Sequence, residues 1–248
     1  MKIFLDVGAH EGQSLLSIQE PKYAFDIIYC FEPVKKLHTK LNEIAAGQKN
    51  IVLLKYGLWN KTASQKIYSP GTVAGSVFLG HQDVDPHDFE LCEFVNASDW
   101  FKKHITPEDE VYVKLNCEGA EAGILLDLLT SGEIFKIRNV MIDFDVRKVK
   151  GLESVRQDVL DKFKAANFKS YSLCEDVMRG PTHLIRIQSW LDQAGANETG
   201  IKSRAAQFAH SFKMVISGKR KGYSWELKHF IKAYTPQFLL KILGARRS

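Results

Sequence analysis

The sequence has few cysteines and no paired cysteine motif. Its four cysteines, Cys30, Cys92, Cys117 and Cys174, are scattered over 248 residues without a C-x-x-C pair. This spacing argues against a disulfide framework or a zinc site and favours a reducing compartment. No apolar run approaches the roughly 18 residues that span a bilayer, and the chain opens with a strand pattern rather than a signal peptide. We therefore expect a soluble, cytoplasmic protein.

Internal repeats and low-complexity segments are also lacking. With 45% hydrophobic and 25% charged residues, the composition is that of a globular protein, which excludes collagen-like and wholly disordered chains. The length suits one α/β domain with a sizeable core, followed by an appendage.

Acidic residues are almost absent from the last fifth of the chain. From residue 200 onward there are eleven lysines and arginines against one acid, Glu226, while residues 1–199 hold 23 basic and 28 acidic residues. By this count the body carries a charge of about −5 and the tail about +10. We expect the tail to contact an anionic partner.

Residues 1–187 alternate short apolar runs with helical patterns. Strand patterns occupy residues 3–7, 27–31, 51–54, 111–115 and 140–144, helical patterns occupy 13–18, 34–46, 120–129 and 154–166, and the polar stretch 60–90 indicates short strands or loop. This alternation predicts an α/β fold with a Rossmann-like, doubly wound and mostly parallel sheet. Two further runs, 171–173 and 183–187, flank Gly180-Pro181 and predict a C-terminal hairpin. We assign this domain to residues 1–190.

The segment 195–248 has a different character and predicts a basic, amphipathic helical extension. Apolar residues recur there every three to four positions among lysines and arginines. One interpretation is an anchor on an anionic membrane surface through residues 200–248, which would make the protein peripheral to a membrane. A second is a helical cap packed on the core. Nucleic acid is a third and less favoured partner, since aromatic residues interleave with the basic ones but no RNA-binding module accompanies them.

A glycine-containing turn follows the first predicted strand. Gly8 and Gly12 lie between this strand and a helix start, where bare backbone lets a ligand approach the loop. Glu32 ends the second strand, about 20 residues later, a position suited to accepting hydrogen bonds from both ribose hydroxyls. Together these features predict a cofactor that contains a nucleoside.

The residues alone leave two cofactor classes open, a dinucleotide and S-adenosylmethionine. The loop lacks the G-x-G-x-x-G spacing that lets a pyrophosphate approach. Asp6, at the strand end, is unsuited to a pyrophosphate but compatible with a cationic amino-acid moiety. These two features favour S-adenosylmethionine.

Three motifs, in this order, resemble those of the FkbM-type methyltransferases, S-adenosylmethionine-dependent O-methyltransferases with a Rossmann-like fold that often act on sugar hydroxyls. The resemblance covers about residues 1–175. The motifs are Phe4-Leu5-Asp6-Val7-Gly8-Ala9-His10-Glu11-Gly12, Phe31-Glu32-Pro33 and Val113-Lys114-Leu115-Asn116-Cys117-Glu118-Gly119-Ala120-Glu121.

The resemblance implies a set of cofactor-binding residues. The first loop would flank the methionine part of the cofactor, Glu32 would hold its ribose, and the segment 58–60 would lie near its adenine. Simple packing is the alternative role for Trp59. The implied residues are Asp6, Gly8, Ala9, Gly12, Glu32, Trp59 and Asn60.

The chain departs from the family pattern at one position. The family reads Lys-Ile-Asp-Val-Glu-Gly-Ala-Glu, whereas this sequence has Asn116 in place of the aspartate. An amide forms hydrogen bonds but neither takes a proton as a base nor supplies a charged metal ligand. The roles of that carboxylate therefore pass to Glu118, or the protein binds cofactor without turnover.

The candidate catalytic residues lie at the end of the fourth strand. Glu118 is the candidate general base, Lys114 could orient a substrate oxygen unless it is merely a solvated lysine, and Asn116 occupies the family's acidic position. Glu121 fits a first-turn helix residue better than a catalytic one. Asp143 and Asp145 end the fifth strand and could join Glu118 around a divalent cation, although we expect no metal.

The sequence thus predicts an S-adenosylmethionine-dependent O-methyltransferase that acts on a hydroxyl of a glycan or glycolipid. One alternative is a ribose 2′-O-methyltransferase that acts on RNA, which the basic tail suggests. Another is a catalytically silent, membrane-associated module that binds the cofactor, which Asn116 makes conceivable.

Overall fold

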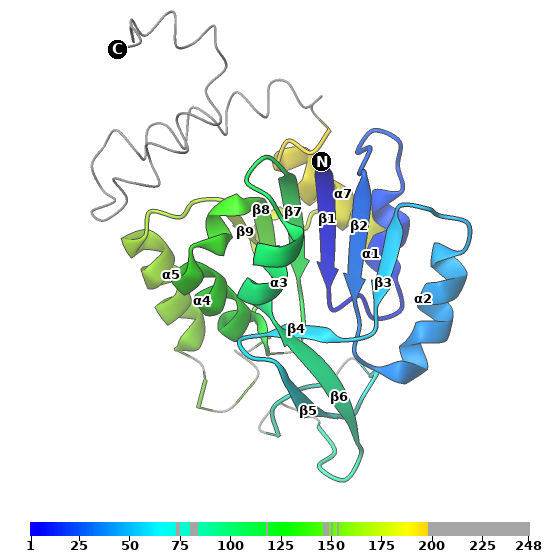
Figure 1. Cartoon of the computed structure of the whole chain (residues 1–248), viewed down its shortest axis with the longest axis vertical. Helices are drawn as coiled ribbons and strands as arrows, with labels where there is room; N and C mark the ends of the chain where they lie inside the picture. Colours follow the sequence, from blue (N-terminus) through cyan, green and yellow to red (C-terminus); the bar gives the residue numbers. More distant parts are fainter. Residues whose placement is uncertain are drawn as a thin grey trace, which may run out of the picture. The chain divides into compact units, whose positions relative to one another are not determined.

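The computed structural model describes residues 1–72, 75–79, 84–117, 119–145, 149, 151–152 and 154–197. Its centre is a six-stranded sheet in the order β3-β2-β1-β7-β8-β9, and every pair of neighbouring strands is parallel (Figure 1). The strands are β1 (Lys2–Val7), β2 (Ile27–Phe31), β3 (Ile51–Leu54), β7 (Glu110–Leu115), β8 (Ile137–Ile142) and β9 (Tyr171–Leu173). The predicted Rossmann-like α/β sheet is confirmed, and the described strands make it wholly parallel.

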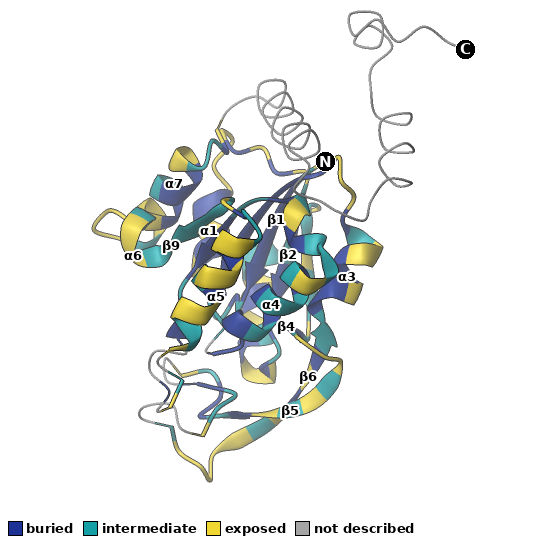
Figure 2. Cartoon of the chain, turned by 90° about the vertical axis from the view of Figure 1, so that its left-hand side faces the viewer, coloured by how far each residue is buried: buried dark blue, intermediate teal, exposed yellow. Residues whose placement is uncertain are grey.

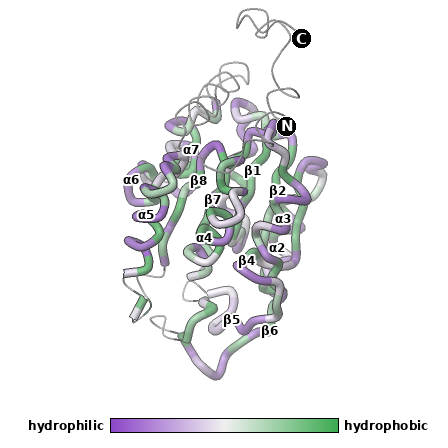
Figure 3. The backbone as a smooth tube through the Cα atoms, turned by 60° about the vertical axis from the view of Figure 1, so that its left-hand side comes forward, coloured by the Kyte–Doolittle hydropathy of each residue, from purple (hydrophilic) through white to green (hydrophobic). Residues whose placement is uncertain are grey.

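The central strands are buried on both faces, as a parallel sheet requires. All six residues of β7 are buried, and so are the last five of β1 (Figure 2). Strand β1 is hydrophobic along most of its length (Figure 3). Such strands show near-continuous apolar runs because helices cover both sides of the sheet. The pairing of β1 with β7 sets Asp6 opposite Lys114.

Helices cover each face of the sheet, which makes it doubly wound. On one face, alternate β1 residues Ile3, Leu5 and Val7 pack with α3 (Ala97–His104), α4 (Glu121–Ser131) and α5 (Val155–Ala165). On the other face, Phe4 packs with α1 (Gln13–Ile18), α2 (His38–Ala45) and α7 (His183–Gln193). The short helices η1 (Lys35–Leu37), η2 (Glu133–Lys136) and α6 (Cys174–Val177) complete the set in the described ranges.

A small second sheet is inserted between β3 and β7. It has the order β4-β6-β5, with β4 (Gly57–Trp59) parallel and β5 (Ala63–Tyr68) antiparallel to β6 (Phe89–Asn96). The polar stretch 60–90 was expected to hold short strands or loop, and it holds β5 and the start of β6. Helix α3, which follows, was not predicted, although Asn96 caps it by accepting a hydrogen bond from the Asp99 N–H.

The predicted C-terminal hairpin is wrong. Strand β9 pairs in parallel with β8, and residues 183–193 form helix α7 instead of a second strand. The Thr182 side chain caps this helix by accepting from the Ile185 N–H. Ile187, Trp190 and Leu191 then bury one helical face against the sheet. The spacing of three and four residues between these buried side chains is that of a helix. It extends beyond the short alternation of apolar residues in 183–187 that suggested a strand.

The predicted basic extension, 195–248, lies outside the described residues except for 195–197. Among the described helices, none combines the length and the apolar character needed to cross a membrane.

Candidate cofactor site

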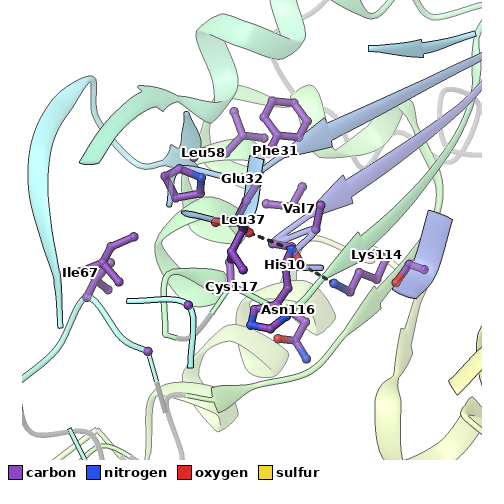
Figure 4. A pocket seen from close by; sticks show the side chains of 18 of the residues that line it. Val7, His10, Phe31, Glu32, Leu37, Leu58, Ile67, Lys114, Asn116 and Cys117 are labelled. Carbon is purple, nitrogen blue, oxygen red and sulfur yellow. Dashed lines mark hydrogen bonds between the residues drawn. The ribbon is translucent and has the colours of Figure 1, made fainter. Parts of the chain in front are cut away.

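A cavity of about 300 Å³ lies at the carboxyl edge of the central sheet (Figure 4). Gly8, Glu32 and Asn116, the residues that directly follow β1, β2 and β7, all line it. The small sheet closes the opposite side through Gly57, Leu58, Ile67 and Phe94. Ligands of open α/β sheets bind at this edge, where the order of strands reverses beside β1.

The glycine loop, residues 8–12, packs closely between the ends of β2 and β7. Gly8 has a φ of +82°, and a Cβ built on it would lie 1.9 Å from the Asn116 carbonyl oxygen. The Gly8 and Ala9 N–H groups both donate to the Phe31 carbonyl at 3.1 Å. Gly8 and Ala9 line the cavity, whereas Gly12 does not: a Cβ there would lie 2.7 Å from the Ile44 side chain. The loop thus needs glycine for backbone packing as well as for ligand access.

Glu32 presents a buried carboxylate to the cavity. Its side chain is 5% exposed, with Oε2 accepting from the His10 N–H at 2.8 Å and Oε1 from the Val34 N–H at 2.9 Å. Burial raises the pKa of Glu32 to about 7, although these two hydrogen bonds and Lys114 act in the opposite direction. Each carboxylate oxygen accepts about two hydrogen bonds, so each retains capacity for one more donor.

Asp6 does not line the cavity. Its carboxylate is fully buried and forms an ion pair with Lys114, with 3.0 Å between Oδ1 and Nζ. The Lys114 ammonium also donates to the Gly8 carbonyl at 2.7 Å, and Lys114 itself is part of the cavity wall. Lys114 is therefore neither solvated nor free to move, and the pair fixes the position of the glycine loop.

The turn after β7 is fixed by polar contacts. Asn116 lines the cavity, and its Nδ2 donates to Asp143 Oδ2 at 3.2 Å. The Glu121 carboxylate is fully buried and accepts the N–H groups of Cys117, at 2.8 Å, and of Gly119. Burial raises the pKa of Glu121 to about 7. Glu121 thus stabilises the turn. Glu118, the predicted general base, lies outside the described residues.

Two histidines face the cavity from distant parts of the chain. His10 follows the glycine loop, and His183 comes from α7, with its Nε2 3.2 Å from the Ser14 hydroxyl oxygen. Burial lowers the pKa of both imidazoles. His183 was missed in the sequence because the contact joins residues 169 positions apart and its helix was predicted as a strand.

Residues of two described stretches, 71–72 and 75–77, also line the cavity, and the sequence did not predict this. Gly71, Thr72, Gly75, Ser76 and Val77 contribute to the wall. The Ser69-Pro70-Gly71 turn was the only signal in the sequence, and it indicated a turn rather than a site.

The predicted adenine-binding pair lies away from the cavity lining. Trp59 packs its ring 5.4 Å from that of Phe94 and lies against α4, where a Cβ on Gly123 would approach its Nε1 to 3.1 Å. The Asn60 carbonyl accepts from Asn96 Nδ2 at 3.0 Å. Of the segment 58–60, only Leu58 lines the cavity.

Metal-ligating side chains do not converge in the part of the chain that the structure describes. No group of three histidine, cysteine, aspartate or glutamate residues there is arranged to hold an ion.

The fold and the cavity define a doubly wound α/β protein with a ligand-sized site where the strand order reverses. No protein-family model and no curated protein matches the sequence. Among solved structures, the chain is similar to the crystal structure of methyltransferase FkbM from Methylobacillus flagellatus KT. The two are 18% identical with a TM-score of 0.35, and the match covers 52% of this chain and 29% of the other. The chain thus spans less than a third of that protein's length.

Proposed function

We propose that the protein is an S-adenosylmethionine-dependent O-methyltransferase of the FkbM type. The observation that carries this proposal is the Glu32 carboxylate, buried at the cavity wall beside the Gly8 loop. The three sequence motifs support it, because each of them reaches this cavity: the first through Gly8, the second through Glu32 and the third through Asn116.

The residues present fit such a cofactor. The cavity volume of about 300 Å³ is at the lower end of the range for small-molecule sites. The free acceptor positions of Glu32 match the two hydroxyls of a ribose.

The protein would act mainly by positioning. The cofactor supplies a methyl group already activated on a sulfonium sulfur, so the chain has to hold an acceptor oxygen in line with it and exclude water. The glycine loop and Glu32 would hold the adenosyl part, while the ion pair of Asp6 with Lys114 keeps that loop in place.

We propose a sugar hydroxyl of a glycan or glycolipid as the acceptor, on the basis of the family resemblance. Asn116 replaces the acid that the family has after this strand, and its amide is bonded to Asp143. A proton acceptor for the hydroxyl must therefore come from another residue.

Calorimetric titration of S-adenosylmethionine at pH 8, where Glu32 is ionised, tests the proposal. Glu32→Gln should weaken binding about 10- to 100-fold, because it removes charged hydrogen bonds worth roughly 1.5–3 kcal/mol. Glu11→Gln is the matched control: Glu11 is on the same loop but pairs with Lys40 and does not line the cavity. Absence of binding, or equal affinities for the two variants, would refute the proposal.

A further inference from the structure

The cavity is apolar on one side of Glu32 and polar on the other. Figure 4 shows Ile67 and Lys114 on opposite sides of this carboxylate. Ser14 and His183 also line the cavity and lie next to each other, and the charge of Lys114 acts on the His183 imidazole. We call these three residues, Ser14, Lys114 and His183, the polar end of the cavity. A nucleoside whose ribose contacts Glu32 would direct its base towards the apolar side and its 5′ substituent towards the polar end.

Helix α7 presents His183 to the cavity with one ring nitrogen bonded and the other open. Nε2 lies 3.2 Å from the hydroxyl oxygen of Ser14, which is buried. Nδ1 has no hydrogen-bond partner in the described part of the chain, and it is not one of the buried polar atoms that lack a partner, so it is accessible to a ligand. When the Ser14 hydroxyl donates to Nε2, the neutral imidazole carries its proton on Nδ1 and offers it as a donor.

The charges around His183 favour an anionic ligand group. Burial is the main cause that lowers the pKa of His183, Lys114 and Arg186 lower it further, and Asp6 raises it. Two cations therefore act here against one carboxylate, and Asp6 is fully buried and does not line the cavity. The Lys114 ammonium has three N–H groups, and the Gly8 carbonyl and Asp6 engage two of them. The polar end thus attracts a carboxylate more strongly than an ammonium group.

We propose that the polar end binds the carboxylate at the amino-acid end of S-adenosylmethionine and S-adenosylhomocysteine, with His183 Nδ1–H as its donor. This inference rests on the proposed methyltransferase function. Ser14 is a positioning residue, which sets the orientation and the tautomer of the His183 ring, and Lys114 contributes its positive charge. The site therefore extends to α7, which follows the stretch 1–175 that resembles the FkbM-type family, and it selects nucleosides that carry an anionic group on their 5′ substituent.

Two ligands that differ only in the carboxylate test the inference. They are S-adenosylhomocysteine and its decarboxylated form, S-adenosyl-3-thiopropylamine, which keeps the adenosyl group, the thioether and the amine. Calorimetric titration of the full chain at pH 8 should give a Kd about 10- to 100-fold lower for S-adenosylhomocysteine, because only this ligand forms a charged hydrogen bond with the polar end.

Variants of His183 assign this preference to one side chain. His183→Phe keeps a ring but removes the donor, so it should weaken binding of S-adenosylhomocysteine about tenfold and change binding of the decarboxylated ligand less than about threefold. His183→Asn places an amide nitrogen close to the position of Nδ1 and should keep most of the preference. Ser14→Ala should reduce the preference about threefold, because the ring loses the bond that orients it. His104→Phe is the matched control and should change neither Kd, since His104 is stacked on Trp100 and does not line the cavity.

Histidine NMR on the unaltered chain gives a second readout that needs no variant. A carboxylate bound at Nδ1 stabilises the imidazolium form, so the pKa of His183 should be higher by roughly one unit in the complex with S-adenosylhomocysteine than in the complex with the decarboxylated ligand. His104 should titrate identically in both complexes, because it does not line the cavity.

The two levels of the proposal fail differently. Absence of binding for both ligands would overturn the proposed function. Equal Kd values for the two ligands in the unaltered protein, or equal pKa values of His183 in their complexes, would overturn the carboxylate subsite alone. An equal loss of affinity for both ligands in His183→Phe would show that this side chain acts through packing, and it would overturn the role of His183 as the donor.

Discussion

Gly8 is the glycine at the site where an added methyl group has least space. Ala at this position combines a positive φ with a Cβ that would lie 1.9 Å from a backbone oxygen, which cannot rotate away. We expect Gly8→Ala to lower the free energy of unfolding by about 3 kcal/mol or more. Gly47 has nearly the same φ, +79°, but open space around it, so Gly47→Ala should cost about 1 kcal/mol. Denaturant unfolding of both variants measures the difference, and equal costs would contradict the structure.

Glu32 should make the stability of the fold depend on pH. Its pKa is about 7 in the folded protein against an ordinary 4.5, so the folded state holds the proton more strongly. Stability should therefore fall as the pH rises from about 4.5 to 7, by up to about 3 kcal/mol for this residue. Glu121, with a pKa also raised to about 7, adds a similar decrease.

Urea unfolding at pH 5 and pH 8 isolates the contribution of Glu32. In Glu32→Gln the decrease between these pH values should shrink, because only Glu121 still takes up the extra proton. The histidines contribute alike in both proteins, so the difference between the proteins belongs to Glu32. A decrease in unfolding free energy of the same size in both proteins would show that burial does not destabilise the ionised form of Glu32.

Local sequence located part of the site and missed the rest for a physical reason. Gly8, Ala9 and Glu32 follow predicted strands and lie together at the sheet edge, although their cofactor-binding role stays a prediction. The pairing of Asp6 with Lys114 depends on the register of two strands more than 100 residues apart, which no local pattern contains.

Helix α7 contributes both to the core and to the cavity wall. Trp190 is fully buried, and its Nε1 donates to Asn139 Oδ1 at 2.7 Å, which ties the helix to β8. Trp190→Ala should cost about 3–5 kcal/mol of unfolding free energy. Leu184 is on the same helix but 40% exposed, so Leu184→Ala should cost no more than about 0.5 kcal/mol. Similar costs for the two variants, measured by denaturant unfolding, would mean that α7 does not pack as described.

Strands and helices with strong periodicity were predictable, and those defined by weaker signals were not. The predicted strands 27–31 and 51–54 match β2 and β3 in both bounds, because their apolar runs are continuous. Helix α3 was not predicted because its eight residues are mostly polar. The sequence feature that indicates the start of this helix is the N-cap residue Asn96. Residues 183–187 were misread because five residues of alternation are too few to separate a strand from one side of a helix.

The charge of the whole chain is divided between an acidic body and a basic tail. We propose that residues 200–248 attach the protein to an anionic membrane surface, because the sequence of this segment contains eleven lysines and arginines and only one acidic residue. The full chain should sediment with vesicles containing phosphatidylglycerol at low salt, and this binding should be lost at about 0.5 M salt through screening. A chain ending at residue 197 should remain in the supernatant. Equal sedimentation of the two chains would exclude the tail as the attachment, and binding to RNA in place of vesicles would favour the nucleic-acid alternative.

A crystal structure of the full chain with S-adenosylhomocysteine tests the central claim most directly. We predict that the adenosyl group occupies the cavity at the ends of β1, β2 and β7, with its ribose hydroxyls within hydrogen-bond distance of the Glu32 carboxylate. A ligand bound elsewhere on the chain, or one in the cavity whose ribose makes no contact with Glu32, would contradict this account.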